Sequence, residues 1–267
     1  MSEHIYERDG DRFVPTEWAG GPWSPDAQHG GPAAGLFMRA AEACSAEAGL
    51  QLARLTVDLF RPIPKQPLRL AKRWLRRGRK LALAELKLLH GDEEVSRASA
   101  LLLVPRPELA TSWSDPMPAP PPPDGGDPHE FMPPWFREQS PPGFHLSIEA
   151  RTVRDELGFA AWLTTPLELV ADEATSSQVR FGMLSDLSFA MGGRLALLRG
   201  SADTRTLPTR FINADITVYR ERVPEGAWLG FRPSVMSDHA GIGVAEVVQF
   251  DRAGRIGRSL QALVANS

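Results

Sequence analysis

The sequence predicts an α+β fold in which one structural unit occurs twice along the chain. Three observations lead to this prediction. A proline-rich stretch divides the 267 residues into two segments of similar length. The two segments match in one ungapped register, and each has a helical pattern followed by long strand patterns. Because a lone helix followed by antiparallel strands buries its apolar stripe on one face of the sheet, we expect each sheet to wrap its helix.

The proline-rich stretch runs from Pro105 to Pro142 and holds more than half of the chain's 24 prolines. Proline lacks a backbone donor and has a fixed φ, so this stretch excludes a helix interior or a central strand. We expect an N-terminal unit at residues 1–104, a linker at 105–143 and a C-terminal unit at 144–267. The aromatic residues of the linker favour a surface-wrapping segment over a free tether; they are Trp113, Phe131, Trp135 and Phe136.

The internal repeat appears when the sequence is shifted by 161 positions, which places residue 54 on residue 215. In this register Arg54–Arg61 matches Asp215–Arg222, and Leu83–Leu86 matches Val244–Val247. Identity is low, but the apolar positions stay in step across the strand region. We therefore infer two copies of one fold.

The first copy is expected to contain one long helix and an antiparallel hairpin. The helix is predicted at Gly31–Ala43, because Pro32 suits a first helical turn and the apolar residues recur on one side. Alternating and apolar runs separated by turn residues predict the strands. These are Arg12–Val14, Arg79–Leu89 and Val95–Val104, with a turn at His90–Asp92.

The second copy repeats this order. Its helix is predicted at Val179–Met191, closed by Gly192 and Gly193. The expected strands are His145–Val153, Phe159–Leu163, Gly243–Phe250 and Ile256–Ala265, with a turn at Asp251–Gly254.

Composition indicates an ordinary globular protein, which we expect in the cytoplasm. The chain has 42% hydrophobic residues and a net charge of −3, which gives no electrostatic argument for nucleic acid as a partner. Cys44 is the single cysteine, which excludes an intramolecular disulfide and a cysteine-built metal site. The first residues lack the layout of a signal peptide, and no apolar run approaches the ~20 residues of a membrane span.

Four strings of residues together resemble the acyl-CoA thioesterase II family, over nearly the whole chain. Members of that family are double hotdog proteins, with two hotdog folds in one chain. The resemblance therefore implies a double hotdog fold and the hydrolysis of acyl-CoA to free acid and CoA, without metal or bound cofactor. The strings are His29–Ala34, Val57–Pro62, Leu184–Phe189 and Ser259–Ala262.

In that family an Asp, a Thr or Ser, and a Gln hold the attacking water. The resemblance assigns the Asp to Asp186 and the Gln to Gln261. The hydroxyl position falls on Asn213, where this sequence departs from the family, although an amide still donates a hydrogen bond to water. At the repeat offset Asn213 and Gln261 meet Leu52 and Ala100. This mismatch predicts one polar site per chain.

Asp186 also has a case that does not depend on the resemblance. Its neighbours at helical spacing carry no polar side chain, and a carboxylate in an apolar stripe is costly unless it is hydrogen-bonded or its pKa rises. Such a group suits general-base catalysis on a water. The alternatives are an Asp that is buried against backbone donors, or a helix register in which this face is exposed. The neighbours are Gly182, Met183, Phe189 and Ala190.

Other polar residues are candidates for the same site. Asp215 is a second carboxylate on the strand face of Asn213, with a solvent-facing position as the first alternative. Gly30 and Gly31 stand at a helix N-terminus, where backbone N–H groups can meet an oxyanion, and His29 precedes them as a cap or substrate-binding residue. A plain tight turn also explains the two glycines.

The segment Arg69–Lys80 is strongly basic. Its guanidinium and ammonium groups suit the phosphates of coenzyme A, and less well a nucleic acid in a chain of acidic total charge. A solvated strand face explains the same pattern.

Two other functions stay open at this stage. A non-hydrolytic acyl-thioester binding protein would share the fold, and Asn213 keeps that alternative open. A hotdog hydratase would need a paired Asp and His, which the local sequence does not display. Serine-hydrolase, zincin and P-loop motifs are absent.

We expect an acyl-CoA partner and a homodimer. Side chains alternate between the two faces of a strand, so the apolar residues of the long strands cannot all point to a helix. Those on the other face form a surface that a second copy can cover, and closed two-fold pairs are the commonest assembly. The apolar residues of the long strands are Leu83, Leu86, Leu88 and Val247.

Overall fold

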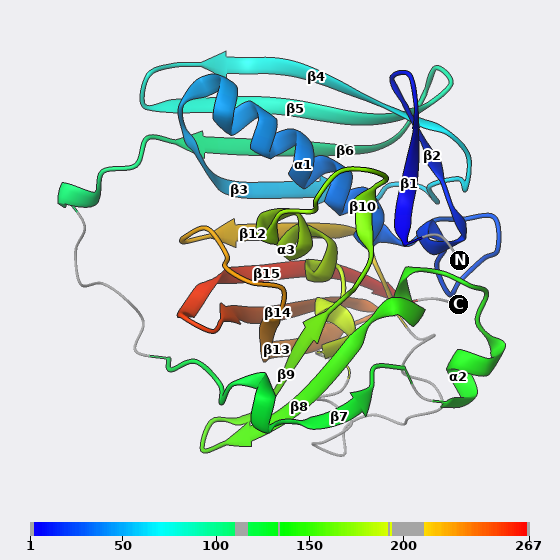
Figure 1. Ribbon diagram of the computed structural model, residues 1–267, viewed down its shortest axis with the longest axis vertical. Coiled ribbons are helices and arrows are strands. Elements are labelled where there is room, and N and C mark those ends of the chain that lie inside the picture. The colour runs from blue at the N-terminus through cyan, green and yellow to red at the C-terminus, as the bar shows by residue number, and fades with distance from the viewer. Residues whose placement is uncertain (1–2, 110–116, 133, 192, 194–210, 266–267) are drawn as a thin grey trace.

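The computed structural model describes residues 3–109, 117–132, 134–191, 193 and 211–265. In this part of the chain one 15-stranded sheet curves around two helices that lie side by side on its concave face (Figure 1). The helices are α1 (Gly30–Ala48) and α3 (Ser177–Ser185), and a short α2 (Pro134–Gln139) lies outside the sheet. The strands are β1 (His4–Asp9), β2 (Arg12–Pro15), β3 (Gln51–Asp58), β4 (Leu68–Arg77), β5 (Leu81–His90), β6 (Glu93–Leu103), β7 (Asp127–Glu130), β8 (Glu149–Asp155), β9 (Gly158–Thr164), β10 (Glu168–Val170), β11 (Phe211–Asn213), β12 (Asp215–Arg220), β13 (Leu229–His239), β14 (Ile242–Asp251) and β15 (Gly254–Ala265).

The two halves of the chain join at the centre of the sheet. The order is β10-β1-β2-β4-β5-β6-β3-β12-β15-β14-β13-β9-β8-β7, and β11 pairs with β15. Strands β3 and β12 pair antiparallel with Thr56 opposite Thr217, and the two hydroxyl groups lie 3.3 Å apart. These threonines are equivalent at the repeat offset of 161. The predicted register is confirmed, and a local two-fold axis passes between them.

Helix α1 begins after His29 and ends at Gly49, which takes the left-handed conformation at φ 63°. It is five residues longer than predicted at its C-terminal end. Glu47 in its last turn accepts hydrogen bonds from Lys72 and from the Trp74 indole, and pairs with Arg77. Part of the basic segment therefore closes the end of this helix, rather than forming a free phosphate-binding surface.

Glycines let the two helices approach closely. A Cβ added to Gly182 of α3 would lie 2.7 Å from Met38 Cβ of α1, and one added to Gly35 would lie 2.6 Å from Met183 Cγ. Real side-chain contacts are longer, so the present crossing requires glycine at both positions. This crossing brings the N-terminal end of α1 to the C-terminal end of α3, where the polar residues gather.

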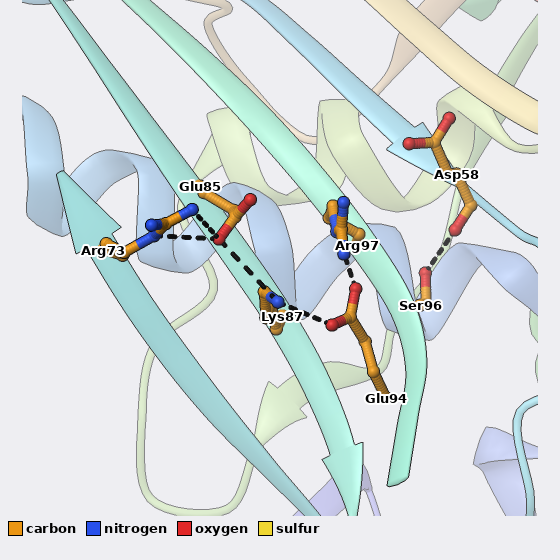
Figure 2. Close-up of polar contacts among 7 residues, drawn as sticks. All are labelled: Asp58, Arg73, Glu85, Lys87, Glu94, Ser96 and Arg97. Carbon is orange, nitrogen blue, oxygen red and sulfur yellow. Dashed lines mark hydrogen bonds and ion pairs between the residues drawn. The ribbon is translucent and has the colours of Figure 1, made fainter. Parts of the chain in front are cut away.

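The two faces of the sheet differ in character. Leu86, Leu88 and Val247 are fully buried on the concave face, whereas Leu83 lies on the convex face and is half-buried. The prediction that these residues do not all face a helix is confirmed for Leu83. Elsewhere on the convex face of the first half, Figure 2 shows a ladder of alternating charges across β4, β5 and β6: Arg73, Glu85, Lys87, Glu94 and Arg97.

Two predicted boundaries in the second half are wrong. Residues 144–147 form a 3₁₀ turn and the strand begins only at Glu149, because Gly143 and Phe144 dock on Gly20 instead of on a neighbouring strand. Helix α3 ends at Ser185, before a turn at Asp186 and Leu187, instead of continuing unbroken to Met191. Gly192 lies outside the described residues.

The described part of the proline-rich stretch lies on the sheet rather than away from it. Strand β7 is the terminal strand of the sheet order, and α2 begins at Pro134, where the missing N–H of proline costs nothing. The Trp162 indole donates a hydrogen bond of 2.6 Å to Pro121 O, and Phe136 is buried. Trp113 lies outside the described residues.

A prediction concerns the ion pair between Asp155, at the β8–β9 turn, and buried Arg232 in β13. Asp155→Asn should lower the free energy of unfolding by about 3 kcal/mol at neutral pH, since it leaves a buried guanidinium without a counter-charge. The hydrogen bonds from Arg232 lower the pKa of the Asp155 carboxyl. The stabilisation is therefore present above the carboxyl pKa of the unfolded chain, and is lost as pH falls through the lowered folded value. Urea unfolding of both proteins at neutral and acidic pH should show the gap closing, and a gap independent of pH would contradict the assignment.

Candidate active site

The end of α3 is shaped by the side chain of Gln261. Its Nε2 donates 2.9 Å to Asp186 O, and its Oε1 accepts 2.7 Å from Phe189 N. In a continuous helix these two backbone groups would bond to residues four away along the helix. A side-chain amide from β15 thus replaces helical hydrogen bonds, which explains the break that the sequence pattern did not reveal.

The Asp186 carboxylate lies at this break and is only 4% exposed. Oδ1 accepts a hydrogen bond of 2.8 Å from Asn213 Nδ2, at the end of β11. Oδ2 lies 2.7 Å from His29 Nδ1, on the residue that precedes α1. Asn213 and Asp186 belong to the second half of the chain and His29 to the first. The structure therefore brings together four of the residues singled out in the sequence: Asp186, Asn213, Gln261 and His29.

Gly30 packs its backbone directly against this carboxylate. A Cβ at Gly30 would lie 2.8 Å from both Oδ1 and Oδ2 of Asp186. A Cβ at Gly31 would lie 2.6 Å from Phe144 Cε1 and 2.8 Å from Met183 O. These two positions require glycine because the N-terminus of α1 lies so close to Asp186, and to Phe144 and Met183, that a Cβ would clash.

The loop before α1 holds His29 in place. Its backbone N–H donates 2.9 Å to Ala19 O. The neighbouring Gln28 side chain accepts 2.6 Å from the buried Tyr6 hydroxyl and donates 2.7 Å to Pro64 O. These anchors fix the position from which the imidazole reaches Asp186.

The proton on His29 follows from the geometry of Nδ1. Nδ1 lies 2.7 Å from Asp186 Oδ2 and 3.1 Å from Gly31 N. If Nδ1 accepted from Gly31, its lone pair would face a carboxylate oxygen at hydrogen-bond distance, which is repulsive. The shorter contact to a charged acceptor favours Nδ1–H donating to Asp186. The Gly31 N–H, which points at Nδ1 as the cap of α1, then faces a protonated nitrogen.

His145 is a site residue that sequence reasoning missed. Its ring is nearly parallel to that of His29, with 6.2 Å between centroids and 14° between planes, and it is 1% exposed. Neither ring nitrogen has a hydrogen-bond partner in the described structure. Burial, with smaller effects from His29 and Arg137, lowers the pKa of His145 to about 3, so the ring is neutral at ordinary pH. The only sequence signal was a histidine placed within a predicted strand.

Asp215 does not join the cluster. Its Oδ1 accepts 2.6 Å from Ala262 N and its Oδ2 accepts 3.1 Å from the Thr217 hydroxyl. Among the described residues its hydrogen-bond partners are these two groups and do not include a residue of the Asp186 cluster. Its carboxylate instead ties β12 to β15.

Comparisons with known proteins identify the family of the chain. Family models for the acyl-CoA thioesterase N-terminal and C-terminal domains match residues 19–103 and 106–265. The class is thus a double hotdog protein, as the sequence predicted. The chain belongs to the acyl-CoA thioesterase family, and is a thioester hydrolase. No curated relative matches the sequence.

Solved structures show the same fold at low identity. The TesB protein of Mycobacterium avium subsp. paratuberculosis is similar, with a TM-score of 0.68 and 18% identity over 98% of this chain and 96% of that one. Acyl-CoA thioesterase II TesB2 of Mycobacterium marinum has a TM-score of 0.65 and 16% identity, over 97% and 93%. A hotdog-fold protein of unknown function from Alicyclobacillus acidocaldarius has a TM-score of 0.66 and 18% identity, over 97% and 95%.

Two features are absent from the part of the chain that the structure describes. No group of three or more His, Cys, Asp or Glu side chains is placed to hold a metal ion. No described helix is both long and apolar enough to cross a membrane.

A prediction follows from the packing of Gly30. Gly30→Ala should reduce turnover of acyl-CoA at least about tenfold and lower the melting temperature, because the methyl group displaces the buried carboxylate from its donors and the helix propensity of alanine offsets this only in part. Gly125→Ala is the matched control, since nothing lies within 4 Å of a Cβ there. Steady-state kinetics and thermal unfolding of both variants measure this. Unchanged turnover by Gly30→Ala would show that the close approach to Asp186 is not needed for activity.

Proposed function

We propose that the chain hydrolyses an acyl-CoA thioester to the free acid and CoA at the Asp186 cluster. The observation that carries this proposal is the buried Asp186 carboxylate, bonded to Asn213 from its own half and to His29 from the other. A buried negative charge beside an imidazole can drive the removal of a proton from water. Membership of the acyl-CoA thioesterase family supplies the substrate class.

The polar partners of Asp186 act on the carboxylate rather than on the water. The sequence assigned the water to Asp186, Asn213 and Gln261 together. The Asn213 amide is bonded to Oδ1, and the Gln261 amide bridges the backbone of Asp186 and Phe189. We therefore assign Asn213 and Gln261 as positioning residues, so that an amide in place of the family's hydroxyl is compatible with hydrolysis.

The N-terminus of α1 is the proposed oxyanion site. The first N–H groups of a helix have no partner within the helix and carry the positive end of its dipole. The N–H groups of Gly30 and Gly31 lie at this N-terminus, and the second points at His29 Nδ1 from 3.1 Å. A donor of this kind would stabilise the negative oxygen of the tetrahedral intermediate, which typically contributes about 3 kcal/mol.

A second candidate function, the addition of water to an enoyl thioester, is favoured by one observation. Asp186 and His29 do pair, although no local sequence pattern revealed it. An imidazole held by a carboxylate moves protons equally well in hydration and in hydrolysis. Non-hydrolytic binding of an acyl thioester is the third outcome of the same experiment.

The experiment is a panel of saturated and enoyl acyl-CoA substrates incubated with the purified protein. Hydrolysis releases free thiol, hydration removes the enoyl absorbance without releasing thiol, and pure binding does neither. We expect thiol release. Asp186→Asn should reduce it by about 10²–10⁴ while the fold is retained, since the amide is nearly isosteric. Asp238→Asn, on the exposed end of β13, is the matched control. Near-wild-type thiol release by folded Asp186→Asn would overturn the assignment.

We also propose that the chain forms a two-fold dimer. The convex face of the second half carries adjacent exposed apolar side chains on β11, β15 and β14. At the repeat offset the first half has Leu81, Leu83 and Leu103 in the positions of Ile242, Val244 and Val264, at the opposite corner of the sheet. A second copy of the chain supplies the same surface and covers it by symmetry. The exposed residues are Ile212, Ile242, Val244 and Val264.

Light scattering of the eluting protein should give twice the 29.3 kDa mass of one chain. Ile242→Lys should shift this mass toward one chain, because Ile242 is 71% exposed and a lysine there adds like charges across the axis. A wild-type mass of one chain at micromolar concentration would refute the dimer.

A further inference from the structure

The Asp186 carboxylate has little room to accept a proton from water itself. Each of its oxygens already accepts from a side-chain donor, Asn213 on Oδ1 and His29 on Oδ2. The backbone of Gly30 covers both oxygens, since a Cβ there would lie 2.8 Å from each. With 4% of the side chain exposed, the carboxylate is arranged to be held in place, not to meet substrate.

The imidazole of His29 is arranged in the opposite way. Its Nδ1 faces Asp186, which leaves Nε2 as the unprotonated nitrogen of the neutral ring. Among the described residues Nε2 has no hydrogen-bond partner, and the His29 side chain is 11% exposed against 4% for that of Asp186. An accessible basic nitrogen, fixed by a buried carboxylate on its far side, has the geometry of a general base.

We propose that His29 Nε2 is the atom that takes the proton from the attacking water, and that Asp186 is the positioning residue that orients His29 and stabilises its charged form. This rests on the proposed hydrolysis and assigns its general base. The base and its partner carboxylate then come from different halves of the chain.

The proton balance of the reaction closes on His29. The water oxygen bonds to the thioester carbon as its proton moves to Nε2, which gives an imidazolium and a tetrahedral intermediate whose oxyanion lies at the N-terminus of α1. When the intermediate collapses, the C–S bond breaks and the imidazolium gives its proton to the leaving sulfur. Free acid and CoA thiol leave, and His29 is again neutral.

The groups around His29 suit a transient imidazolium. Asp186 faces it from the end of α3 with a negative charge, and His145 faces it from the turn before β8. Because burial lowers the pKa of His145 to about 3, that ring places no second positive charge beside His29. Arg137 of α2 is a further charged group, and it lowers the pKa of His145 to a smaller extent than burial does.

The first test is chemical rescue of a variant that lacks the imidazole. His29→Ala should lose about 10²–10⁴ of kcat on the acyl-CoA that the wild-type protein hydrolyses best. Added imidazole should restore part of the lost rate in this variant. It should leave Asp186→Asn and the control His239→Ala, at the exposed end of β13, without a gain. Circular dichroism and thermal unfolding establish that each variant is folded.

A second variant separates catalysis from positioning. His29→Gln keeps a donor that can reach Asp186 but has no basic nitrogen, so we expect it to be as impaired as His29→Ala. If His29→Gln hydrolyses at the wild-type rate, His29 only positions Asp186 and the proposal is overturned. Folded His29→Ala that is fully active, or that gains nothing from imidazole, also overturns it. If the wild-type protein releases no thiol from any acyl-CoA, it is the proposed function that fails.

Discussion

A carboxylate buried between two helices must be given hydrogen-bond donors, because an unpaired buried charge costs several kcal/mol. Asp186 receives one donor from Asn213 and one from His29, and the second of these comes from the other half of the chain. Those contacts need α1 and α3 to cross in close approach, which in turn needs Gly30, Gly35 and Gly182. The junction of β3 and β12 sets the two helices side by side on one sheet, so the site depends on both halves being joined there.

The two copies of the fold contribute different parts of the site. The first half supplies the loop with His29 and the N-terminus of α1, and the second supplies Asp186, Asn213 and Gln261. The positions equivalent to Asn213 and Gln261 in the first half are Leu52 and Ala100, and both are buried in the core. These two positions are apolar in the first half and carry polar donors in the second. The described chain therefore has one complete cluster, around Asp186.

Much of the fold could be predicted because its signals are local. One sequence is enough to detect the alternation of apolar and polar residues in β5 and β14, the glycine turn at Gly91 and the register of the repeat. The pairing of Thr56 with Thr217 confirms that register. The resemblance to a family, rather than any pattern, singled out Gln261. The break of α3 at Asp186, the contact between His29 and Asp186, and the place of His145 could not be predicted. Each depends on side chains from distant strands or loops replacing local hydrogen bonds. The basic segment Arg69–Lys80 was ambiguous for the same reason, since its partner Glu47 lies on a different element.

The proposed mechanism depends most directly on which ring nitrogen of His29 carries the proton. Nitrogen-15 NMR of the imidazole side chains distinguishes the two tautomers, and the His29 signals are assigned by their absence in His29→Gln. The account predicts that neutral His29 in the free protein is the Nδ1–H tautomer, and that this preference is lost in Asp186→Asn. A neutral His29 protonated on Nε2, with Nδ1 accepting from Gly31, would contradict it.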